Sequence, residues 1–379
     1  MRMKAAVGII LVSLGCLGLA RCSFPSSKKI SPSSVFQFPL TEEARIAYDG
    51  DPGPTGLPSS SAAARGLSAA GGKVFFSTSR GTVYAVDVAA RKTAWEFAAK
   101  DSLPASLSVS PDQIIFTGRE NSVTCLTPDG KLRWQKKMEA PVSAAAVQNE
   151  GVAFLIAGET ELVALDTATG KEAWRFKAPS AIRALPVFWN RQIIIGTAGK
   201  TLHFLRATGQ QARVTALDAG LAGPLLVRRD RVFFGLEDGT FQCLALGSKR
   251  RVWKIKTGGT PTAAPVADGD LVFVPASNNA LFCIERGGDL LWWHLLPSRA
   301  PFEPTVCDNC VLASSLSTRL LAYLKTTGEA VGSFDAGEDL RSGPVRVGGN
   351  LLVTTYNPDT DKGSLLFLKG TAPAIPAKK

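Results

Sequence analysis

The chain has 379 residues, of which 45% are hydrophobic and 20% charged, so it can bury a large core and is not a disordered protein. It contains only two histidines, which excludes a histidine-built metal centre and most histidine-based acid–base catalysis. The formal net charge of +11 is basic but below what a nucleic-acid-binding module demands, so we expect no nucleic-acid partner.

Residues 1–21 form a predicted signal peptide. Two basic residues precede an apolar stretch at 5–20, and this stretch of 16 residues is shorter than the roughly 20 that a membrane-spanning helix needs. The sequence LARC at 19–22 resembles a bacterial lipobox, in which the cysteine becomes the lipidated first residue. We therefore predict lipidation of Cys22, with Arg21 standing where the lipobox has a small residue.

A Ser/Pro-rich tether is predicted at residues 22–43, because a run of Ser, Pro and Lys cannot pack into a core. Cleavage before Cys22 removes three cations and no acid, which lowers the net charge from +11 to +8. The alternatives at this end are lipidation of Cys16, a plain signal peptide and an uncleaved anchor. A lipid on Cys22 would hold the folded part of the protein near a membrane surface.

A repeated unit of 39 or 40 residues follows, and it determines the predicted fold. Each copy contains a short apolar run, a polar turn that often includes glycine, and then tryptophan, as in LVALDTATGKEAW at 162–174. Two positions of this spacing hold Arg213 and Gly332 instead of tryptophan. The remaining positions of the ladder are Trp95, Trp134, Trp174, Trp253 and Trp292.

Within each unit the pattern is four short strands separated by turns rich in Gly, Asn and Asp, which is typical of an all-β fold. Seven complete units lie within 66–334, and three more strands follow them. The segment 44–48 supplies one spare strand, which we expect to close the ring by pairing with the last blade. We therefore predict an eight-bladed β-propeller of four-stranded antiparallel blades at 44–370, with seven blades as the alternative, and a disordered tail at 371–379.

A second ladder is made of prolines, which we place within the first strand of each unit. Proline cannot donate a hydrogen bond to a neighbouring strand, so it is confined to edges and strand starts. In a propeller the first strand is the edge that faces the central channel. The prolines are Pro186, Pro224, Pro265, Pro304 and Pro344.

The unit LDTATGKEAW resembles the tryptophan-docking motif of the pyrroloquinoline-quinone-type β-propellers, and the resemblance covers nearly the whole chain after the tether. In that family the tryptophan of one blade packs against a neighbouring blade, and a turn with glycine gives it room. The resemblance therefore implies that the tryptophans of the ladder are structural docking residues.

The same family contains quinone-dependent dehydrogenases and non-catalytic scaffolds. The dehydrogenases hold a quinone over the channel together with a calcium ion, and many have a disulfide between adjacent cysteines. This chain is short for that group, has no adjacent cysteines and lacks a haem Cys-x-x-Cys-His motif. It is more similar to the BamB-type lipoprotein scaffolds, which implies a contact with the periplasmic POTRA domains of the outer-membrane β-barrel insertase.

These observations predict a non-catalytic lipoprotein scaffold, anchored on the periplasmic side of the outer membrane, that acts as a monomer within a larger complex. We expect no catalytic residue, no cofactor and no metal site, because no nucleophile elbow, phosphate loop or metal-helix motif occurs. Two alternatives stay open: a quinone-dependent dehydrogenase, and an envelope sensor or polymer-binding propeller.

The polar residues that remain are interpreted as structural. His203 and His294 are expected to pack within strands. The acidic residues of the central repeats fall in polar turns, where aspartate accepts hydrogen bonds from nearby backbone groups. These acidic residues are Asp230, Glu237, Asp238, Asp268 and Asp270.

The cysteines are divided into two groups. Cys125, Cys243 and Cys283 occupy the same place in the third strand of their units, so we interpret them as small buried hydrophobic residues. Cys307 and Cys310 flank an Asp-Asn turn between two strands. A hairpin disulfide and an incidental pair are the two interpretations of this second group, and redox chemistry is disfavoured because no helix follows.

For partner binding, the resemblance to BamB-type scaffolds points to the loops that join the last strand of one blade to the first strand of the next. In those proteins a Leu-Arg pair shortly before a proline is part of the binding loop. Two pairs here resemble it, Ile182-Arg183 and Leu340-Arg341. Arginine is favoured in interfaces because its planar group offers several donors.

Overall fold

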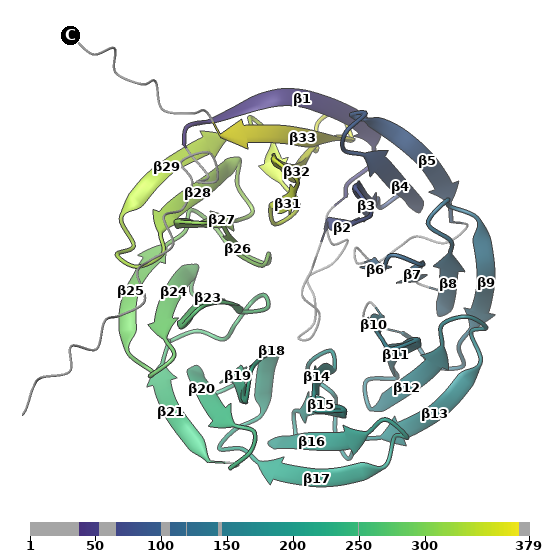
Figure 1. Cartoon of the computed structure of the whole chain (residues 1–379), viewed down its shortest axis with the longest axis vertical. Coiled ribbons are helices and arrows are strands. Elements are labelled where there is room, and N and C mark those ends of the chain that lie inside the picture. The colour runs from purple at the N-terminus through teal and green to yellow at the C-terminus, as the bar shows by residue number, and fades with distance from the viewer. Residues whose placement is uncertain are drawn as a thin grey trace, which may run out of the picture. The chain divides into compact units, whose positions relative to one another are not determined.

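The computed structural model describes residues 38–52, 66–99, 107–118, 120–142, 146–248 and 250–370. These residues form a ring of eight β-sheets around a central channel (Figure 1). The predicted signal peptide, the cysteines at 16 and 22 and the C-terminal tail lie outside the described residues. Within these described ranges, no helix has the length and apolar character needed to cross a bilayer.

Seven of the sheets are blades of four antiparallel strands that follow one another in sequence, from the channel outward. The strands of blades one to four are β2 (Ser68–Ala70), β3 (Lys73–Ser77), β4 (Thr82–Asp87), β5 (Lys92–Ala98), β6 (Ser108–Val109), β7 (Ile114–Thr117), β8 (Ser122–Leu126), β9 (Leu132–Lys137), β10 (Val147–Asn149), β11 (Val152–Ala157), β12 (Glu161–Asp166), β13 (Glu172–Lys177), β14 (Val187–Trp189), β15 (Gln192–Thr197), β16 (Thr201–Arg206) and β17 (Gln211–Ala216). The strands of blades five to seven are β18 (Leu221–Arg228), β19 (Arg231–Leu236), β20 (Thr240–Ala245), β21 (Arg251–Lys256), β22 (Val266–Asp268), β23 (Leu271–Pro275), β24 (Ala280–Glu285), β25 (Leu290–Leu295), β26 (Thr305–Val306), β27 (Cys310–Ser314), β28 (Arg319–Leu324) and β29 (Ala330–Asp335).

The eighth blade joins the two ends of the propeller. Its first three strands are β31 (Val345–Val347), β32 (Asn350–Asn357) and β33 (Lys362–Gly370), and its outer strand is β1 (Leu40–Asp49), which pairs antiparallel with β33. A short strand, β30 (Asp339–Leu340), also pairs with the far end of β32. The predicted eight-bladed fold and its closure by an N-terminal strand are thus confirmed.

Strand β1 is longer than the predicted segment 44–48 and takes in the last part of the predicted tether, because it begins at Leu40. The register against β33 shifts between Glu42 and Ala44, so a bulge interrupts the alternation that the sequence pattern relied on. Glutamates are tolerated here because β1 is an outer edge strand, where charged side chains face solvent.

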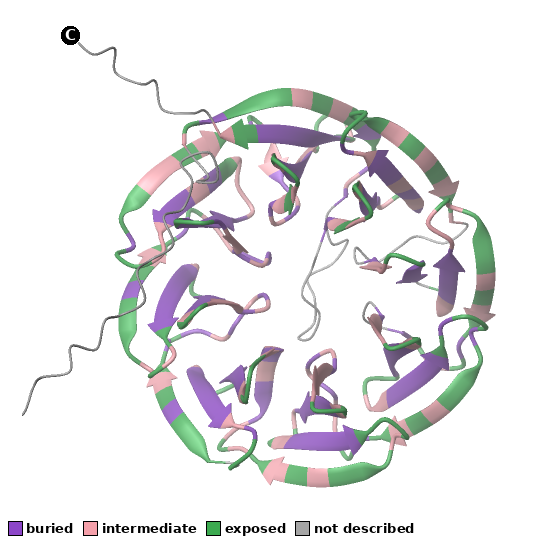
Figure 2. Cartoon of the chain, in the orientation of Figure 1, coloured by how far each residue is buried: buried purple, intermediate pink, exposed green. Residues whose placement is uncertain are grey.

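Burial differs between the strands of a blade and explains their composition. The second and third strands are buried on both faces between neighbouring blades, which suits continuous apolar runs such as Val74–Phe76 in β3. The outer strands instead alternate between exposed and partly buried residues (Figure 2). The core is therefore a series of clusters at the junctions between blades.

Tryptophan docking repeats at five of these junctions. The indole N–H of each ladder tryptophan donates to the carbonyl oxygen of the residue 33 positions later, in the next blade, at 2.7–2.9 Å. The indole also covers a glycine of that blade; a Cβ added to Gly170 would lie 2.7 Å from the ring of Trp134. This glycine has a φ of +72°, which also disfavours a side chain.

The three other junctions are sealed differently. Arg213 lies over the ring of Phe204 at 3.4 Å and donates to a backbone carbonyl of blade five at 3.4 Å. Gly332 leaves room for the ring of Phe38. At the closing junction Tyr48 of β1 packs against Phe76 of blade one with ring centroids 4.7 Å apart.

The proline ladder lies slightly outside its predicted place. Four of the five prolines immediately precede the first strand of their blade, as Pro186 precedes β14. Only Pro224 lies within a strand, β18, and there the register against β19 shifts between Ala222 and Leu226. The prediction that they sit within the first strands is therefore wrong for four of them, because a residue just before a strand needs no N–H for the ladder.

Candidate functional site

A cavity of about 790 Å³ occupies the centre of the ring. All eight blades contribute to its wall, through their first strands or the residues just before them. Aliphatic residues, prolines, serines and threonines make up most of this wall. Among the lining residues that the structure describes, Glu303 is the only charged one.

The polar groups of this wall bind neighbouring blades to one another. Gln148 in blade three donates to the carbonyl oxygen of Ser108 in blade two at 2.8 Å. The hydroxyl of Ser68 in blade one donates to the carbonyl oxygen of Leu107 at 3.2 Å, and Thr305 makes the corresponding bond to blade eight. These side chains stabilise the inner rim of the ring.

The described part of the channel wall does not fit the quinone and calcium ion that dehydrogenases of this fold hold there. Calcium takes six to eight oxygen ligands, usually with several carboxylates. The described wall offers one carboxylate, Glu303, and one side-chain amide, Gln148, and it has no cation for an anionic quinone. Within the described ranges, no three His, Cys, Asp or Glu residues lie close enough to hold a metal ion.

The first predicted binding pair, Ile182-Arg183, lies in the loop between blades three and four. Ile182 is buried and forms an isolated β-bridge with Thr197 of blade four. The backbone N–H of Arg183 donates to the carbonyl oxygen of Gly196 at 2.9 Å. The aliphatic side chain therefore fastens the loop, and Arg183 beside it is partly buried.

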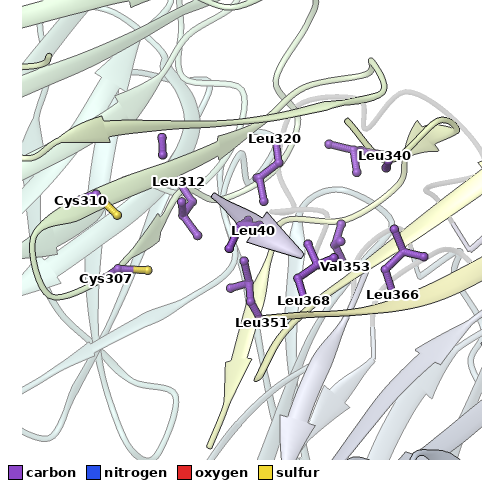
Figure 3. Packing of buried hydrophobic residues seen from close by; sticks show 12 residues of the cluster. Leu40, Cys307, Cys310, Leu312, Leu320, Leu340, Leu351, Val353, Leu366 and Leu368 are labelled. Carbon is purple, nitrogen blue, oxygen red and sulfur yellow. The ribbon is translucent and has the colours of Figure 1, made fainter. Parts of the chain in front are cut away.

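The second pair, Leu340-Arg341, shows the same division of roles in the loop before blade eight. Leu340 is fully buried in β30 and packs in the cluster of Figure 3. Arg341 forms an ion pair with Asp51 at 3.2 Å and lies over the ring of Tyr356 at 5.3 Å. Its side chain is 18% exposed, so this arginine mainly ties the segment after β1 to blade eight.

The structure does not bring the two pairs together. Arg183 precedes blade four and Arg341 precedes blade eight, and these blades lie on opposite sides of the ring (Figure 1). A partner that contacts both must extend across the channel mouth. The sequence motif alone could not show whether the two pairs form one site or two. It occurs in two repeats, and the sequence does not show how far apart those repeats lie in the ring.

The face of the propeller that carries the loops between blades, called the loop face below, has a compact group of charges between blades four and five. Lys254 donates to Asp218 at 3.0 Å and to Asp238 at 3.3 Å, and Arg251 pairs with Asp218 at 2.6 Å. The hydrogen bond from Lys254 lowers the pKa of the Asp218 carboxyl. Both cations are thus neutralised by acids of the same chain.

The candidate carboxylates lie at opposite ends of the blades. Asp230 and Asp270 lie in hairpins between first and second strands, and Asp268 ends β22 beside such a hairpin; Arg286 and Lys325 pair with them. Glu237 and Asp238 occupy the hairpin between the second and third strands of blade five, at the other end of the sheet. The five acids therefore cannot act as one catalytic group.

Both histidines make structural contacts. His203 is buried in β16, and its ring nitrogens lie 2.9 Å from the Thr201 hydroxyl and 2.7 Å from Oε1 of the Gln211 side chain. His294 stacks on Tyr323 with centroids 4.4 Å apart and donates to a backbone carbonyl of blade seven at 2.6 Å.

Three cysteines are inert core residues in the structure. Cys125, Cys243 and Cys283 are completely buried in third strands. Burial raises the pKa of the Cys125 and Cys243 thiols to about 11 and that of Cys283 to about 12. Such thiols stay protonated at neutral pH and are poor nucleophiles.

Cys307 and Cys310 carry free thiols in the structure, and a hairpin disulfide between them stays a prediction. The backbone N–H of Cys307 donates to the carbonyl oxygen of Cys310 at 2.8 Å across a tight turn. Both side chains are buried, and Figure 3 shows their sulfur atoms pointing into the cluster between blades seven and eight. They pack there as small apolar groups, and a hydrogen bond from the Cys307 thiol lowers the pKa of Cys310.

Sequence reasoning missed an exposed apolar row on the outer strand of blade six. Trp293 is 52% exposed and Leu295 is 65% exposed, and Leu290 and Leu291 precede them. Trp292 was interpreted as a ladder residue, and the exposed apolar residues beside it were not considered. A comparison of the first and third positions after each ladder residue would have found the row.

Comparisons with known proteins agree with this geometry. The family model described as outer membrane protein assembly factor BamB matches residues 79–294 and 180–369. A comparison with curated proteins gives no match. BamB from Moraxella catarrhalis superposes with a TM-score of 0.71 at 14% identity, covering 90% of this chain and 100% of that one.

Enzymes share the fold as well. A quinohemoprotein alcohol dehydrogenase from Comamonas testosteroni superposes with a TM-score of 0.67 at 12% identity, covering 93% of this chain and 80% of that one. A europium-containing methanol dehydrogenase gives a TM-score of 0.69 at 11% identity, covering 87% of this chain and 93% of that one.

Fold and repeat together define a β-propeller of the pyrroloquinoline-quinone type. Since the family model covers well over half of the residues, the chain belongs to the family of the outer membrane protein assembly factor BamB.

Proposed function

We propose that this protein is a non-catalytic, lipid-anchored scaffold on the periplasmic side of the outer membrane, where it binds proteins that assemble outer-membrane β-barrels. The family match across residues 79–369 carries this proposal. The channel supports the non-catalytic part, because the residues described in its wall include a single carboxylate and its polar groups bind adjacent blades.

The anchor in this proposal is a lipid on Cys22, followed by the Ser/Pro-rich tether. Such a tether would let the propeller reach a membrane-bound partner without fixing its orientation. Replacement of Cys22 by Ala is expected to release the protein into the soluble periplasmic fraction. Unchanged partitioning of this variant with membranes would contradict the anchor.

The partner in this proposal is the set of periplasmic POTRA domains of the β-barrel insertase, bound by the loops between blades. Arg183 and Arg341 are the two candidate contacts, and Arg341 also pairs with Asp51 and Asp339 within the chain. Arginine in such a loop offers a planar group with several donors to backbone and carboxylate acceptors.

The test is calorimetric titration of the propeller with purified periplasmic domains of the insertase. Saturable binding is expected, weakened about tenfold or more by Arg183→Glu, the loss typical of an interface anchor. Arg319→Glu is the matched control, since Arg319 is an exposed arginine at the same end of blade seven. Absence of binding, together with absence of the insertase from membrane complexes purified with the full chain, would overturn the proposal.

A further inference from the structure

An arginine cluster lies on blades four and five, at the end of the blades that is opposite to the loop face. This end, called the hairpin face below, carries the turns that join the first strand of each blade to the second and the third strand to the fourth. Blades four and five are neighbours in the ring (Figure 1). The cluster consists of five exposed arginines in these turns and the adjoining strand ends: Arg191, Arg206, Arg228, Arg229 and Arg250.

Strand pairing makes the two arginines of blade four neighbours. Arg206 ends β16 and lies opposite Gln192, which directly follows Arg191. A turn of blade five lies next to them, because Arg213 of β17 donates to the carbonyl oxygen of Leu246 at 3.4 Å. The cluster therefore crosses the junction between the two blades.

One of these arginines stands where other blades hold an acid that stabilises the turn. Arg206 is the last residue of a third strand, and blades one, three and six have at this position Asp87, Asp166 and Glu285. Asp166 caps its own turn by accepting a hydrogen bond from the N–H of Thr169 at 2.8 Å. An arginine side chain has no acceptor, so blade four gives up this bond for a cation.

Two other arginines take hairpin positions where the backbone favours glycine. Arg229 has a φ of +54°, and blade six has Gly269 at this position with a φ of +57°. Arg191 has a φ of +58°, and blade three has Gly151 there. Side chains are strained in this conformation, and strain of this kind is found at functional sites. A Cβ added to either glycine meets no atom within 4 Å, so side chains at these positions extend into solvent.

The cluster keeps its positive charge. Within the described ranges, none of its five arginines forms an ion pair with a carboxylate. Asp230, the one acid that the structure describes in these turns, pairs with Arg286 of blade six at 3.4 Å. The hairpins of blades three and six carry Glu150 and Asp270, which bound the cluster on both sides. The uncompensated positive charge is thus confined to two neighbouring blades.

We propose that the arginine cluster docks on the anionic phospholipid headgroups of a membrane; the presence of that membrane rests on the proposed function. Cations near an anionic lipid surface are attracted to it, and arginine can contact a phosphate through two donors. The course of the chain favours this occupant over an acidic protein. Leu40 begins β1 opposite Gly370, at the hairpin end of blade eight, and the predicted tether precedes it in the sequence.

The tether and the cluster together would orient the propeller. Blade eight lies across the ring from blade four (Figure 1), so the two attachments are on opposite sides of one face. A flexible tether alone leaves the orientation free, whereas two attachments lay the hairpin face on the membrane. The loop face with Arg183 then points away from the lipid, toward partners in the periplasm.

The test labels the arginines of the full chain with phenylglyoxal and measures each site by mass spectrometry, with and without vesicles. Vesicles of phosphatidylcholine mixed with phosphatidylglycerol are expected to slow labelling of the cluster about tenfold, and vesicles of phosphatidylcholine alone are not. Arg319 on the loop face is the internal control and should be labelled at an unchanged rate. A rise from about 0.1 M to about 1 M salt should abolish the protection, because it shortens the screening length from about 10 Å to about 3 Å.

The double variant R228E/R229E is expected to lose the protection at the other three arginines of the cluster. Glutamate fits this hairpin, because Glu150 of blade three has a φ of +47° at the position of Arg229. The matched control K131E/K171E makes the same change of charge on the hairpin face of blades two and three and is expected to keep the protection.

Equal loss of protection in both double variants would reduce the effect to net charge and overturn the proposal. Equal protection by phosphatidylcholine vesicles would also overturn it, and protection by inorganic phosphate alone would replace it with a small-anion site. Protection by polyglutamate but not by vesicles would assign the cluster to an acidic protein instead. Binding to the insertase domains tests the proposed function separately, because R228E/R229E leaves Arg183 unchanged and is expected to bind them as the parent chain does.

Discussion

The regular junctions between blades and the closing junction stabilise the ring in different ways. At the five regular junctions one tryptophan fills the gap and bonds to a turn 33 residues ahead. At the closing junction Tyr48 and the whole length of β1 do this work, through pairs that join residues more than 300 positions apart. Local docking can form as each blade folds, whereas closure must wait until the chain ends have met.

Because closure depends on β1, removal of this strand should cause the largest loss of stability. Deletion of residues 40–49 removes β1 and leaves β33 as an open edge. We expect the deleted chain to lose its cooperative thermal transition and to aggregate, as measured by calorimetry and size-exclusion chromatography. A peptide of residues 38–52 added in trans should restore a monomer, and a stable monomer without the peptide would contradict this account.

Removal of a ladder tryptophan at a regular junction should cause the next largest loss of stability. Trp292→Ala deletes a buried indole together with its hydrogen bond to Lys325, and is expected to lower the free energy of unfolding by about 3–5 kcal/mol. Arg213→Ala at the irregular junction should cost about 0.5–1 kcal/mol, because a cation over a ring contributes less. Urea unfolding of both variants measures the difference, and equal losses would show that the ladder position itself is unimportant.

The glycine under the indole sharpens the same comparison. Gly170→Ala combines a positive φ with a clash against Trp134, and we expect a loss of about 2–4 kcal/mol in unfolding free energy. Gly151→Ala is the control, because that glycine also has a positive φ but nothing lies near its added Cβ, so only about 1–2 kcal/mol should be lost. A similar loss in both variants would show that contact with the docked indole does not contribute to the cost of the Gly170 substitution.

The smallest expected effect concerns the ion pairs of the loop face. Since the Lys254 hydrogen bond lowers the pKa of Asp218, this contribution is present above the ordinary value of 3.8 and is lost as the pH falls below it. Asp218 is 48% exposed, so solvent screens the pair and Asp218→Asn should shift the thermal midpoint by only about 2 °C or less. Thermal melts from pH 7 to pH 3 should show the variant and the parent converging, and divergence at low pH would contradict the sign.

Most of the fold could be predicted from the sequence because every blade repeats one pattern and the tryptophans mark its period. The prediction was least accurate where the repeat is interrupted. Glu42 and Glu43 break the alternation of β1, so its start at Leu40 was missed. The prolines were placed inside strands, since the pattern could not distinguish a strand from the residue before it.

The site was harder to predict than the fold. The Ile182-Arg183 and Leu340-Arg341 pairs were recognised as motifs, but the burial of Ile182 and Leu340 was not predicted. It depends on an isolated β-bridge and on the two-residue strand β30, which are too short to leave a pattern in the sequence. The apolar row on β25 was overlooked because Trp292 explained the tryptophan-rich segment on its own. The exposed hydrophobic residues of β25 are recognised as unusual only when the same positions are compared across the blades.

The central proposal is that the surface of the ring binds partner proteins and that its channel carries out no chemistry. The most direct test of this proposal is a titration with pyrroloquinoline quinone and calcium. A quinoprotein alcohol dehydrogenase stripped of its cofactor serves as the positive control, and dye reduction with simple alcohols is followed in parallel. The account predicts no saturable binding and no dye reduction by this protein. Stoichiometric quinone binding with reduction of the dye would contradict it.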